Sequence, residues 1–383
     1  MDFTFNTSTG LELDRCDTVF NTIQIFWLVS YSVLFIISVG GNCLVCLVVI
    51  GQERMRTVTN YFLLNLAIGD IAKGVLCIPF TFVINVLVPY WPFGSFMCPF
   101  IMYMQIVTVF LSAFTLVAMS FDRYVAIIHP LRPKLTTRKA LLTIAIVWIL
   151  ALAVPIPTVV KSRVYTNPYP NTSKECQKGL CLDIFEDNVL QQVYTIAIMC
   201  IQYVIPLIVL MFTYTRIGYI IWIKRTPGEA ERRRDERIAS SKRKMVKMMI
   251  VMVITYAVCW LPIHAIRLYE ENIEDSEALY NSEHYQFTWT GFHWLAMSYA
   301  CYNPIVYFWM NKRFRAGFKS MFFLCTHCKK GNGRSICSKR RPRLPNRTNS
   351  GSSSRFSPRA SIDETKILKM SFLHKDHGDP HDL

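Results

Sequence analysis

Long apolar stretches alternate with short polar ones along most of the chain. Seven apolar runs of membrane-spanning length lie at 25–50, 61–88, 98–128, 140–160, 189–223, 245–268 and 287–310. A bilayer core about 30 Å thick is crossed by roughly 20 helical residues. The short alternating strands that build a membrane β-barrel are not seen in the sequence. The pattern therefore predicts an all-α membrane protein, a bundle of seven transmembrane helices within residues 25–310.

The polar connections between the runs indicate which end of each helix is cytoplasmic. The connection after the fifth run, KRTPGEAERRRDERIASSKRKMVK, is strongly basic, whereas the connection after the sixth, YEENIEDSEALYNSEHYQ, has six carboxylates and no Lys or Arg. Lys and Arg are retained on the cytoplasmic side. We therefore expect a multi-pass plasma-membrane protein with an extracellular tail over 1–24 and a cytoplasmic C-terminus. No cleavable signal peptide is expected, because the tail lacks a basic region followed by a short apolar one.

The segment after the last run has an apolar face and a basic face. Residues 311–324 are therefore predicted to form an amphipathic helix on the membrane surface. Cys325 and Cys328 follow at the membrane edge and are candidates for palmitoylation, with unmodified thiols as the alternative. Residues 325–383 are low in complexity, which predicts a disordered cytoplasmic tail whose serines are candidate kinase sites.

The net charge of +16 does not indicate a nucleic-acid partner. The excess lies on the cytoplasmic loops and tail, where the anionic heads of the lipid bilayer attract it. The sequence contains no zinc-ligand spacing and no aromatic RNA-binding motif. Its histidines lack metal-ligand spacing with acids in one span, and no nucleophile constellation is evident. We therefore expect no enzyme, no metal site and no cofactor.

Four of the thirteen cysteines lie on the extracellular side or at its rim. They are Cys16, Cys98, Cys176 and Cys181. Cysteines outside the cell meet an oxidising compartment, so two disulfides can form, in one of three pairings. Asn6 and Asn171 each begin a glycosylation sequon on the same side of the membrane.

Polar and helix-breaking residues stand inside the apolar runs, where they are costly. They are Asn42, Asp70, the Asp122-Arg123 pair, Trp148, Pro206, the CWLP of 259–262 and the NPIVY of 303–307. Each alone has a structural explanation, since a proline kinks a helix and a buried amide bonds across one. One such signature in every span, in this order, indicates a specific family.

In this combination the chain resembles the rhodopsin-like (class A) G-protein-coupled receptors over about residues 25–325. The motifs that carry the resemblance are GN at 41–42, LNLA-x-x-D at 64–70, W-x-F-G at 91–94 with Cys98, DRY at 122–124, Trp148, Pro206 with Tyr214, CWLP at 259–262, NPIVY at 303–307 and NKRFRAGFKSMF at 311–322. The resemblance implies a heterotrimeric G protein as the cytoplasmic partner, with receptor kinases and arrestin acting on the tail.

The resemblance also implies how the cytoplasmic end works. Arg123 is expected to be held by Asp122 at rest and to swing, on activation, into a cavity that admits the G protein. Other residues assigned to coupling and activation are Tyr124, Tyr214, Asn303, Pro304 and Tyr307. Lys242 stands where many such receptors have an acid that restrains the arginine, so we expect a loose resting state.

Asp70 marks a polar core in the middle of the bundle. Related receptors often bind sodium at this position, helped by residues that match Ser112 and Asn303. Lys73 lies three residues after Asp70, on nearly the same helical face. Its ammonium either replaces the ion or points elsewhere, towards another polar niche.

The ligand class follows from a residue near the outer end of the third span. Receptors for amines carry an Asp seven residues after the cysteine that matches Cys98, and here that residue is Gln105. A neutral amide cannot balance an ammonium ligand. The chain is similar to receptors for neuropeptide Y, tachykinins, RYamide/luqin and RFamide peptides, which implies a short, basic, C-terminally amidated neuropeptide. A non-peptide ligand, or a seven-helix transporter, is the alternative, although no internal repeat suggests a transporter.

The same similarity implies the residues that bind the ligand. They are Gln105, Gln202, Trp260 at the floor of the pocket, His264, Arg267 and Glu271. Glu271 matches an acid that pairs with a ligand arginine, through a planar bidentate contact. Glu270 is its rival, since one residue turns a helical side chain by about 100°. Arg267 would repel a cationic ligand unless Glu271, four residues on, pairs with it.

The resemblance finally favours one pairing of the outer cysteines. Cys98 tops the third span, and Cys181 resembles the second-loop cysteine of peptide receptors. A Cys98–Cys181 disulfide is therefore expected, which leaves Cys16–Cys176 as the second bridge.

Overall fold

The computed structural model describes residues 22–88, 90–133, 135–165, 179–183, 185, 187–223, 232–273 and 283–328. The predicted glycosylation sites at Asn6 and Asn171 and the predicted Cys16–Cys176 bridge lie outside these residues, as does the predicted tail beyond 328.

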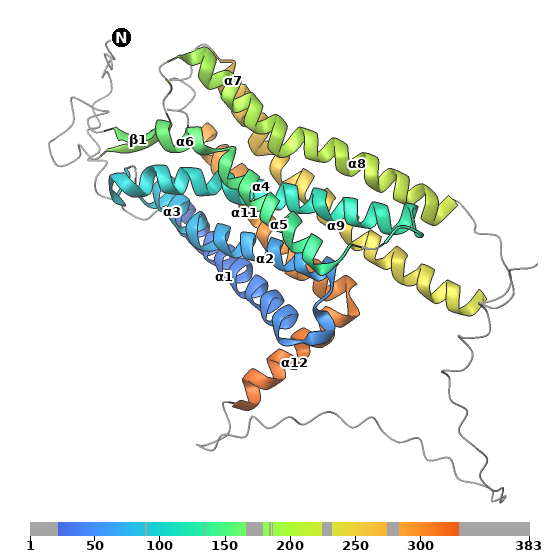
Figure 1. The fold of residues 1–383 in the computed structure, drawn as a ribbon. Helices are drawn as coiled ribbons and strands as arrows, with labels where there is room; N and C mark the ends of the chain where they lie inside the picture. The colour runs from blue at the N-terminus through green and yellow to red at the C-terminus, as the bar shows by residue number, and fades with distance from the viewer. Residues whose placement is uncertain are drawn as a thin grey trace, which may run out of the picture. The chain divides into compact units, whose positions relative to one another are not determined.

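Helices dominate the described part of the chain (Figure 1). Their order is α1 (Thr22–Gly51), η1 (Glu53–Met55), α2 (Val58–Leu76), α3 (Ile78–Phe82), η2 (Val83–Leu87), α4 (Gly94–Ile128), α5 (Thr137–Ala153), α6 (Ile156–Lys161), α7 (Asn188–Met199), η4 (Cys200–Val204), α8 (Ile205–Gly218), η5 (Tyr219–Ile223), α9 (Arg232–Glu271), α11 (Glu283–Met310) and α12 (Lys312–Cys328). Two antiparallel strands, β1 (Ser162–Tyr165) and β2 (Leu180–Asp183), lie between α6 and α7.

Six helical stretches of the described residues are long and apolar enough to cross a membrane. They are Thr22–Gly51, Val58–Leu87, Gly94–Ile128, Thr137–Lys161, Asn188–Ile221 and Lys242–Glu271. The seventh predicted span corresponds to α11, which has 28 residues but carries more polar side chains. Two of these, His293 and Asn303, are buried. Part of the polarity of α11 therefore faces the interior of the bundle, and the predicted all-α membrane fold is confirmed.

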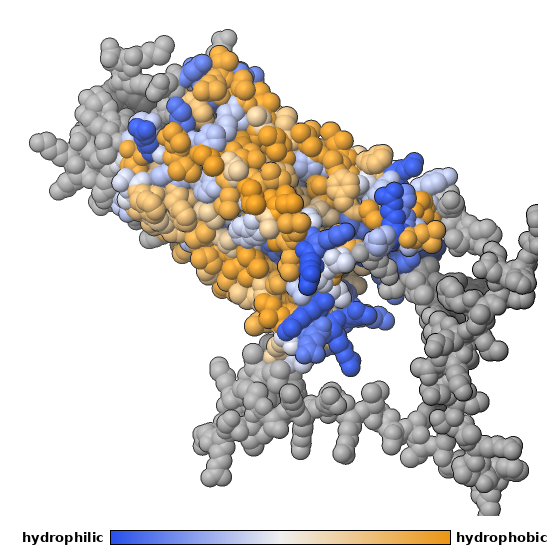
Figure 2. Space-filling model, viewed as in Figure 1, coloured by the Kyte–Doolittle hydropathy of each residue, from blue (hydrophilic) through white to orange (hydrophobic). Residues whose placement is uncertain are grey.

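The outer faces of the helices are apolar, as expected for contact with lipid. Ile36, Leu142 and Met211 are 67%, 62% and 68% exposed. Figure 2 shows apolar side chains along the sides of the helices, with hydrophilic ones gathered towards the ends. A lipid environment removes the hydrophobic force between helices, so small residues and interhelical hydrogen bonds must hold them together.

One small residue and one hydrogen-bonded amide connect α1 and α2 to other helices of the bundle. A Cβ atom on Gly41 of α1 would lie 2.9 Å from Pro304 Cγ of α11, so only glycine allows this close approach. Asn65 of α2 donates to Thr115 of α4 at 2.8 Å and accepts from Trp148 Nε1 of α5 at 2.8 Å. One amide therefore links three helices.

Pro206 explains a further contact, between α8 and α9. A proline cannot donate to the carbonyl four residues earlier, which here is that of Gln202. The chain forms a π-helical turn over Cys200–Val204, and the Tyr256 hydroxyl of α9 donates to the Gln202 carbonyl oxygen at 2.8 Å. The tyrosine therefore satisfies the group that the proline leaves free.

Candidate functional site

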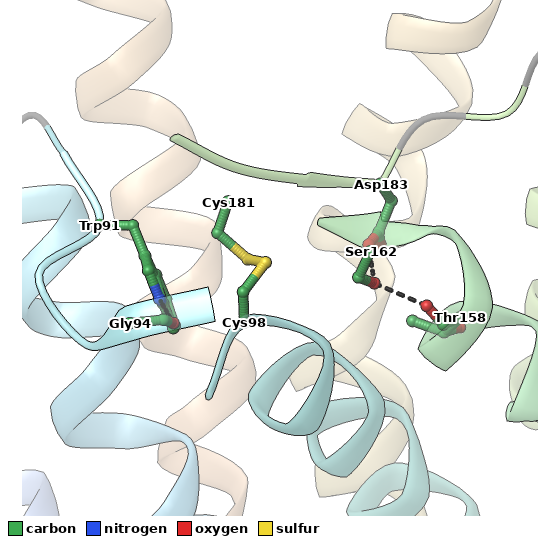
Figure 3. The surroundings of a disulfide bond; sticks show 7 residues. All are labelled: Trp91, Gly94, Cys98, Thr158, Ser162, Cys181 and Asp183. Atoms are coloured by element: carbon green, nitrogen blue, oxygen red, sulfur yellow. Dashed lines mark hydrogen bonds between the residues drawn. A yellow bond between two sulfur atoms is a disulfide. The ribbon is translucent and has the colours of Figure 1, made fainter. Parts of the chain in front are cut away.

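The extracellular end is organised by a disulfide between α4 and β2 (Figure 3). It joins Cys98 to Cys181, with 5.6 Å between the two Cα atoms, which is the pairing that the family resemblance implied. The pair Val164↔Cys181 lies in the β1–β2 ladder, so the bridge fixes the whole hairpin to the top of α4. The Trp91 backbone N–H also donates to the Gly179 carbonyl oxygen at 2.8 Å.

The hairpin is held at its other side by Ser162. The Ser162 hydroxyl donates to the Thr158 carbonyl oxygen at 2.7 Å and also contacts the Asp183 carboxylate. The turn before α4 is shaped by Gly94, whose φ of +79° is one that a side chain would strain. Trp91 Nε1 donates to the Gly94 carbonyl oxygen at 2.7 Å, and Figure 3 shows the indole beside the disulfide.

Two glutamines predicted to bind the ligand lie on helices inside the bundle. Gln105 of α4 is half-buried, and its Nε2 donates to Thr81 Oγ1 of α3 at 2.6 Å. Gln202 is buried in the π-helical turn before α8, and its Oε1 atom has no hydrogen-bond partner among the described residues. Buried polar atoms are seldom left unpaired, so this amide retains the capacity to accept a hydrogen bond.

Trp260 and His264 lie on one face of α9, one turn apart. The His264 ring centroid is 4.7 Å from that of Tyr203 and 6.1 Å from that of Trp260. Both side chains are buried, and neither Trp260 Nε1 nor His264 Nε2 has a partner in the described part of the chain. The three rings form one buried aromatic cluster, and the assignment of Trp260 to the floor of a ligand pocket and of His264 to its wall stays a prediction.

The rival acids at the outer end of α9 face different neighbours. Glu271 Oε1 accepts from Thr195 Oγ1 of α7 at 3.0 Å, whereas Glu270 Oε1 accepts from the Tyr285 hydroxyl of α11. Both glutamates are half-buried. A pair between Arg267 and Glu271, which would keep Arg267 from repelling a cationic ligand, is not found among the described residues, where the ion pairs are Lys73–Asp70 and Arg123–Asp122. Arg267 is exposed.

One polar contact near this end was missed from the sequence. The Tyr31 hydroxyl of α1 lies 3.0 Å from His293 Nδ1 of α11, and the His293 ring stacks on Trp289 with centroids 5.2 Å apart. His293 Nε2 has no partner in the described chain. An ionisable residue inside a span was the available signal, but the partner on α1 is 262 positions away.

The polar core lies deeper in the bundle, around Asp70. Asn303 Nδ2 donates to Asp70 Oδ2 at 2.7 Å, and Lys73 Nζ lies 3.8 Å from Asp70 Oδ1. Lys73 therefore points towards Asp70 rather than to another niche. Ser112, the third predicted member, donates to the Thr108 carbonyl oxygen of its own helix at 3.1 Å.

The cytoplasmic end places Arg123 at the centre of a small network. Its Nε donates to Asp122 Oδ2 at 3.0 Å, its Nη2 donates to Thr59 Oγ1 of α2, and its Nη1 lies 3.3 Å from Met245 Sδ of α9. The arginine thus bridges α2 and α9, and none of the described side chains of α9 brings an acid into contact with it. Thr59 was not predicted, because nothing in its local sequence distinguishes it.

The other residues predicted for activation surround this network or the polar core. Tyr214 of α8 and Tyr307 of α11 are buried, and the Tyr307 hydroxyl has no partner among the residues described. Tyr124 is half-buried one position after Arg123, and Pro304 packs against α1 at Gly41. Cys325 and Cys328 fall in the last turns of α12.

Comparisons with known proteins agree with this architecture. The chain matches the model of the 7 transmembrane receptor (rhodopsin family) over residues 41–307. It is 43% identical to the RYamide receptor of Drosophila melanogaster, in an alignment that covers 83% of this chain and 67% of that one. It is 44% identical to the RYamide receptor of Tribolium castaneum, with 75% and 78% covered. The human Substance-P receptor is 36% identical, with 80% and 73% covered. The chain belongs to the rhodopsin family of seven-transmembrane receptors.

Proposed function

We propose that this receptor binds a short, C-terminally amidated peptide with a basic residue near its end, of the RYamide kind, and couples it to nucleotide exchange on a heterotrimeric G protein. The observation that carries the proposal is a neutral, hydrogen-bonding interior below an acidic rim. The similarity of the chain to two RYamide receptors, at 43% and 44% identity, supports the choice of peptide.

The amide end of the peptide is matched by the interior groups. A C-terminal amide is uncharged and can both donate and accept hydrogen bonds. The unpartnered Gln202 Oε1 and His264 Nε2 atoms, and the Gln105 amide, offer complementary partners without a charge. A free carboxylate would bring a negative charge into this interior, where the described cations are the exposed Arg267 and, beneath Trp260, Lys73, which is already paired with Asp70.

The basic residue of the peptide is matched by the rim. Glu271 accepts one hydrogen bond, at Oε1 from Thr195, and each carboxylate oxygen has two acceptor sites. A guanidinium can therefore form a bidentate contact while the Thr195 bond persists. Glu270 is bound by Tyr285 on the α11 side and serves as the alternative partner. Arg267 repels a cationic residue placed above it, so it contributes less to ligand binding than Gln105 does.

The cytoplasmic end supports coupling to a G protein. Arg123 is held by Asp122, Thr59 and the sulfur of Met245. Asp122 is on α4 and Thr59 is on α2, so neither contact depends on α9. Of these three contacts, outward movement of α9 breaks the weak one to the Met245 sulfur. The freed arginine then faces the G protein. Receptor kinases and arrestin are proposed to act on the tail, and palmitate on Cys325 and Cys328.

Two proposed modifications concern the extracellular side. Asn6 and Asn171 carry glycans in this proposal, and a Cys16–Cys176 bridge ties the N-terminal tail over the ligand site.

A non-peptide ligand is the second candidate for the site, and membership of the receptor family disfavours a transporter. The experiment that separates them measures nucleotide exchange in membranes that contain the full-length receptor and a G protein. The panel contains amidated peptides ending in Arg-Tyr, in Arg-Phe and in a tachykinin-type sequence. We expect the Arg-Tyr amide to act at the lowest concentration. Exchange driven by none of the three peptides would overturn the proposal.

A further inference from the structure

Lys73 is a charged side chain buried completely in the middle of α2. Its exposed fraction is 0%, and its neighbour Asp70 is equally buried. An ionisable residue at such depth is costly and is retained where it has a task. The distance of 3.8 Å from Nζ to Asp70 Oδ1 places the ammonium beside the carboxylate of its own helix.

The same ammonium lies between two aromatic rings from two other helices. Lys73 Nζ is 5.2 Å from the centroid of Trp260 on α9 and 5.2 Å from that of Tyr299 on α11. A cation within about 6 Å of a ring centroid is attracted by the electrons of the ring face, and more strongly where water is excluded. Nζ has no hydrogen-bond partner among the described residues. Its attraction to Asp70 and to the two rings therefore keeps it in place.

Related receptors often bind a sodium ion at the position of Asp70. In this chain the residues around Asp70 are not suited to bind one. Asp70 Oδ1 faces the ammonium, and Oδ2 accepts from Asn303 Nδ2 at 2.7 Å. Ser112 Oγ donates to the carbonyl oxygen of Thr108 in its own helix. A metal cation beside Asp70 would meet the positive charge of Lys73 at close range, where like charges repel strongly in a medium of low dielectric constant.

We propose that Lys73 supplies the cation of this core from within the chain and acts as a positioning residue for Trp260. The ammonium attracts the Asp70 carboxylate, the indole of Trp260 and the ring of Tyr299, and so ties α2, α9 and α11 together in the ligand-free receptor. Only the identification of Trp260 as the floor of the ligand site rests on the proposed function.

Two consequences follow from a cation that cannot dissociate. Sodium does not stabilise the ligand-free receptor, because its place is taken. Any ligand that displaces Trp260 must also separate the indole from the Lys73 ammonium, so the energy of that contact opposes activation. Removal of the charge should therefore expose the Asp70 carboxylate to soluble cations and loosen Trp260.

The test uses the melting temperature of purified, ligand-free, full-length receptor in matched sodium chloride and choline chloride. We expect no difference between the two salts for the wild type. Lys73→Met, which is unbranched and one atom shorter and has no charge, should melt several degrees higher in sodium, because an ion that binds only the folded state stabilises it. Lys73→Arg retains a cation and should remain insensitive to sodium.

Lys161 provides a matched control at the extracellular end of α6. Its Nζ lies 5.6 Å from the Phe185 ring centroid, so Lys161→Met also removes a cation beside a ring, but away from Asp70. This variant should remain insensitive to sodium. Selective stabilisation of the wild type by sodium would overturn the proposal, even if Lys73→Met cannot be purified.

A double-mutant cycle tests the contact with Trp260. Lys73→Gln and Trp260→Leu are measured alone and together in choline chloride. If the ammonium holds the indole, the combined loss in melting temperature is smaller than the sum of the single losses, and strict additivity would refute the contact. No step requires a peptide. The results therefore stand or fall independently of the proposed peptide ligand.

Discussion

The exchange of Glu271 for Gln removes one charge at the rim and changes little else. The side chain is half-buried and accepts a hydrogen bond from Thr195 at 3.0 Å, and a glutamine of the same shape can keep that bond. The proposed guanidinium of the peptide would lose its counter-charge. Loss of one partner of a desolvated pair costs about 2–5 kcal/mol.

The partial exposure of Glu271 sets the expected magnitude. Solvent reaches both partners at the rim, so the lower end of that range applies. A loss of about 2 kcal/mol corresponds to roughly 30-fold in affinity, at about 1.4 kcal/mol per factor of ten. Glu270→Gln is the matched control, since it removes the same charge one residue away, on the Tyr285 side.

The assay is competition binding of an Arg-Tyr amide and of the same peptide with citrulline in place of arginine, which keeps the shape without the charge. We expect citrulline to weaken binding to the wild type by a similar factor, and to add little loss in Glu271→Gln. Losses that simply add would show that the two groups do not touch. If instead Glu270→Gln couples to the citrulline change, the pair must be reassigned to Glu270.

Three further predictions concern contacts between secondary-structure elements, each measured by thermal melting of the purified receptor. Gly41→Ala should destabilise it by about 1–3 kcal/mol, because the added Cβ would lie 2.9 Å from Pro304. Gly40→Ala, whose Cβ would meet nothing within 4 Å, should be neutral or stabilising, and equal effects would contradict the close approach. Tyr256→Phe should cost about 1–3 kcal/mol, because the Gln202 carbonyl loses its donor; an unchanged melting temperature would argue against that bond. Cys98→Ser and Cys181→Ser should each cost about 2–5 kcal/mol, and the double variant should lose no more than either alone, since all three break one bond.

The helices of the fold were predictable because membrane spans are encoded locally. About 20 consecutive apolar residues suffice for each span, and the basic loops orient them. The helix α11 is the instructive case. It is the one predicted span whose described helix is too polar to meet a simple hydropathy criterion, although residues 287–310 were predicted from the sequence as one of the seven apolar runs. Its buried His293 and Asn303 are two of the polar residues that lower its mean hydropathy.

Contacts between distant side chains could not be predicted in the same way. The sequence placed Lys73 on the face of Asp70 but could not decide where its long, flexible side chain points. That direction depends on Trp260 and Tyr299, which come from helices that begin more than 150 residues later. The partners of Arg123 on α2 and of His293 on α1 were missed for the same reason. The choice between Glu270 and Glu271 likewise depends on neighbours from α11 and α7.

The most direct test of the account compares one peptide in two chemical forms on one membrane preparation. A peptide ending in Arg-Tyr is supplied as the amide and as the free acid, and both binding and nucleotide exchange on a G protein are measured. Wild-type receptor should bind the amide far more tightly than the acid and promote exchange. Arg123→Ala should bind the amide almost as well and promote no exchange. Equal responses to both forms of the peptide, or normal exchange by Arg123→Ala, would contradict the account.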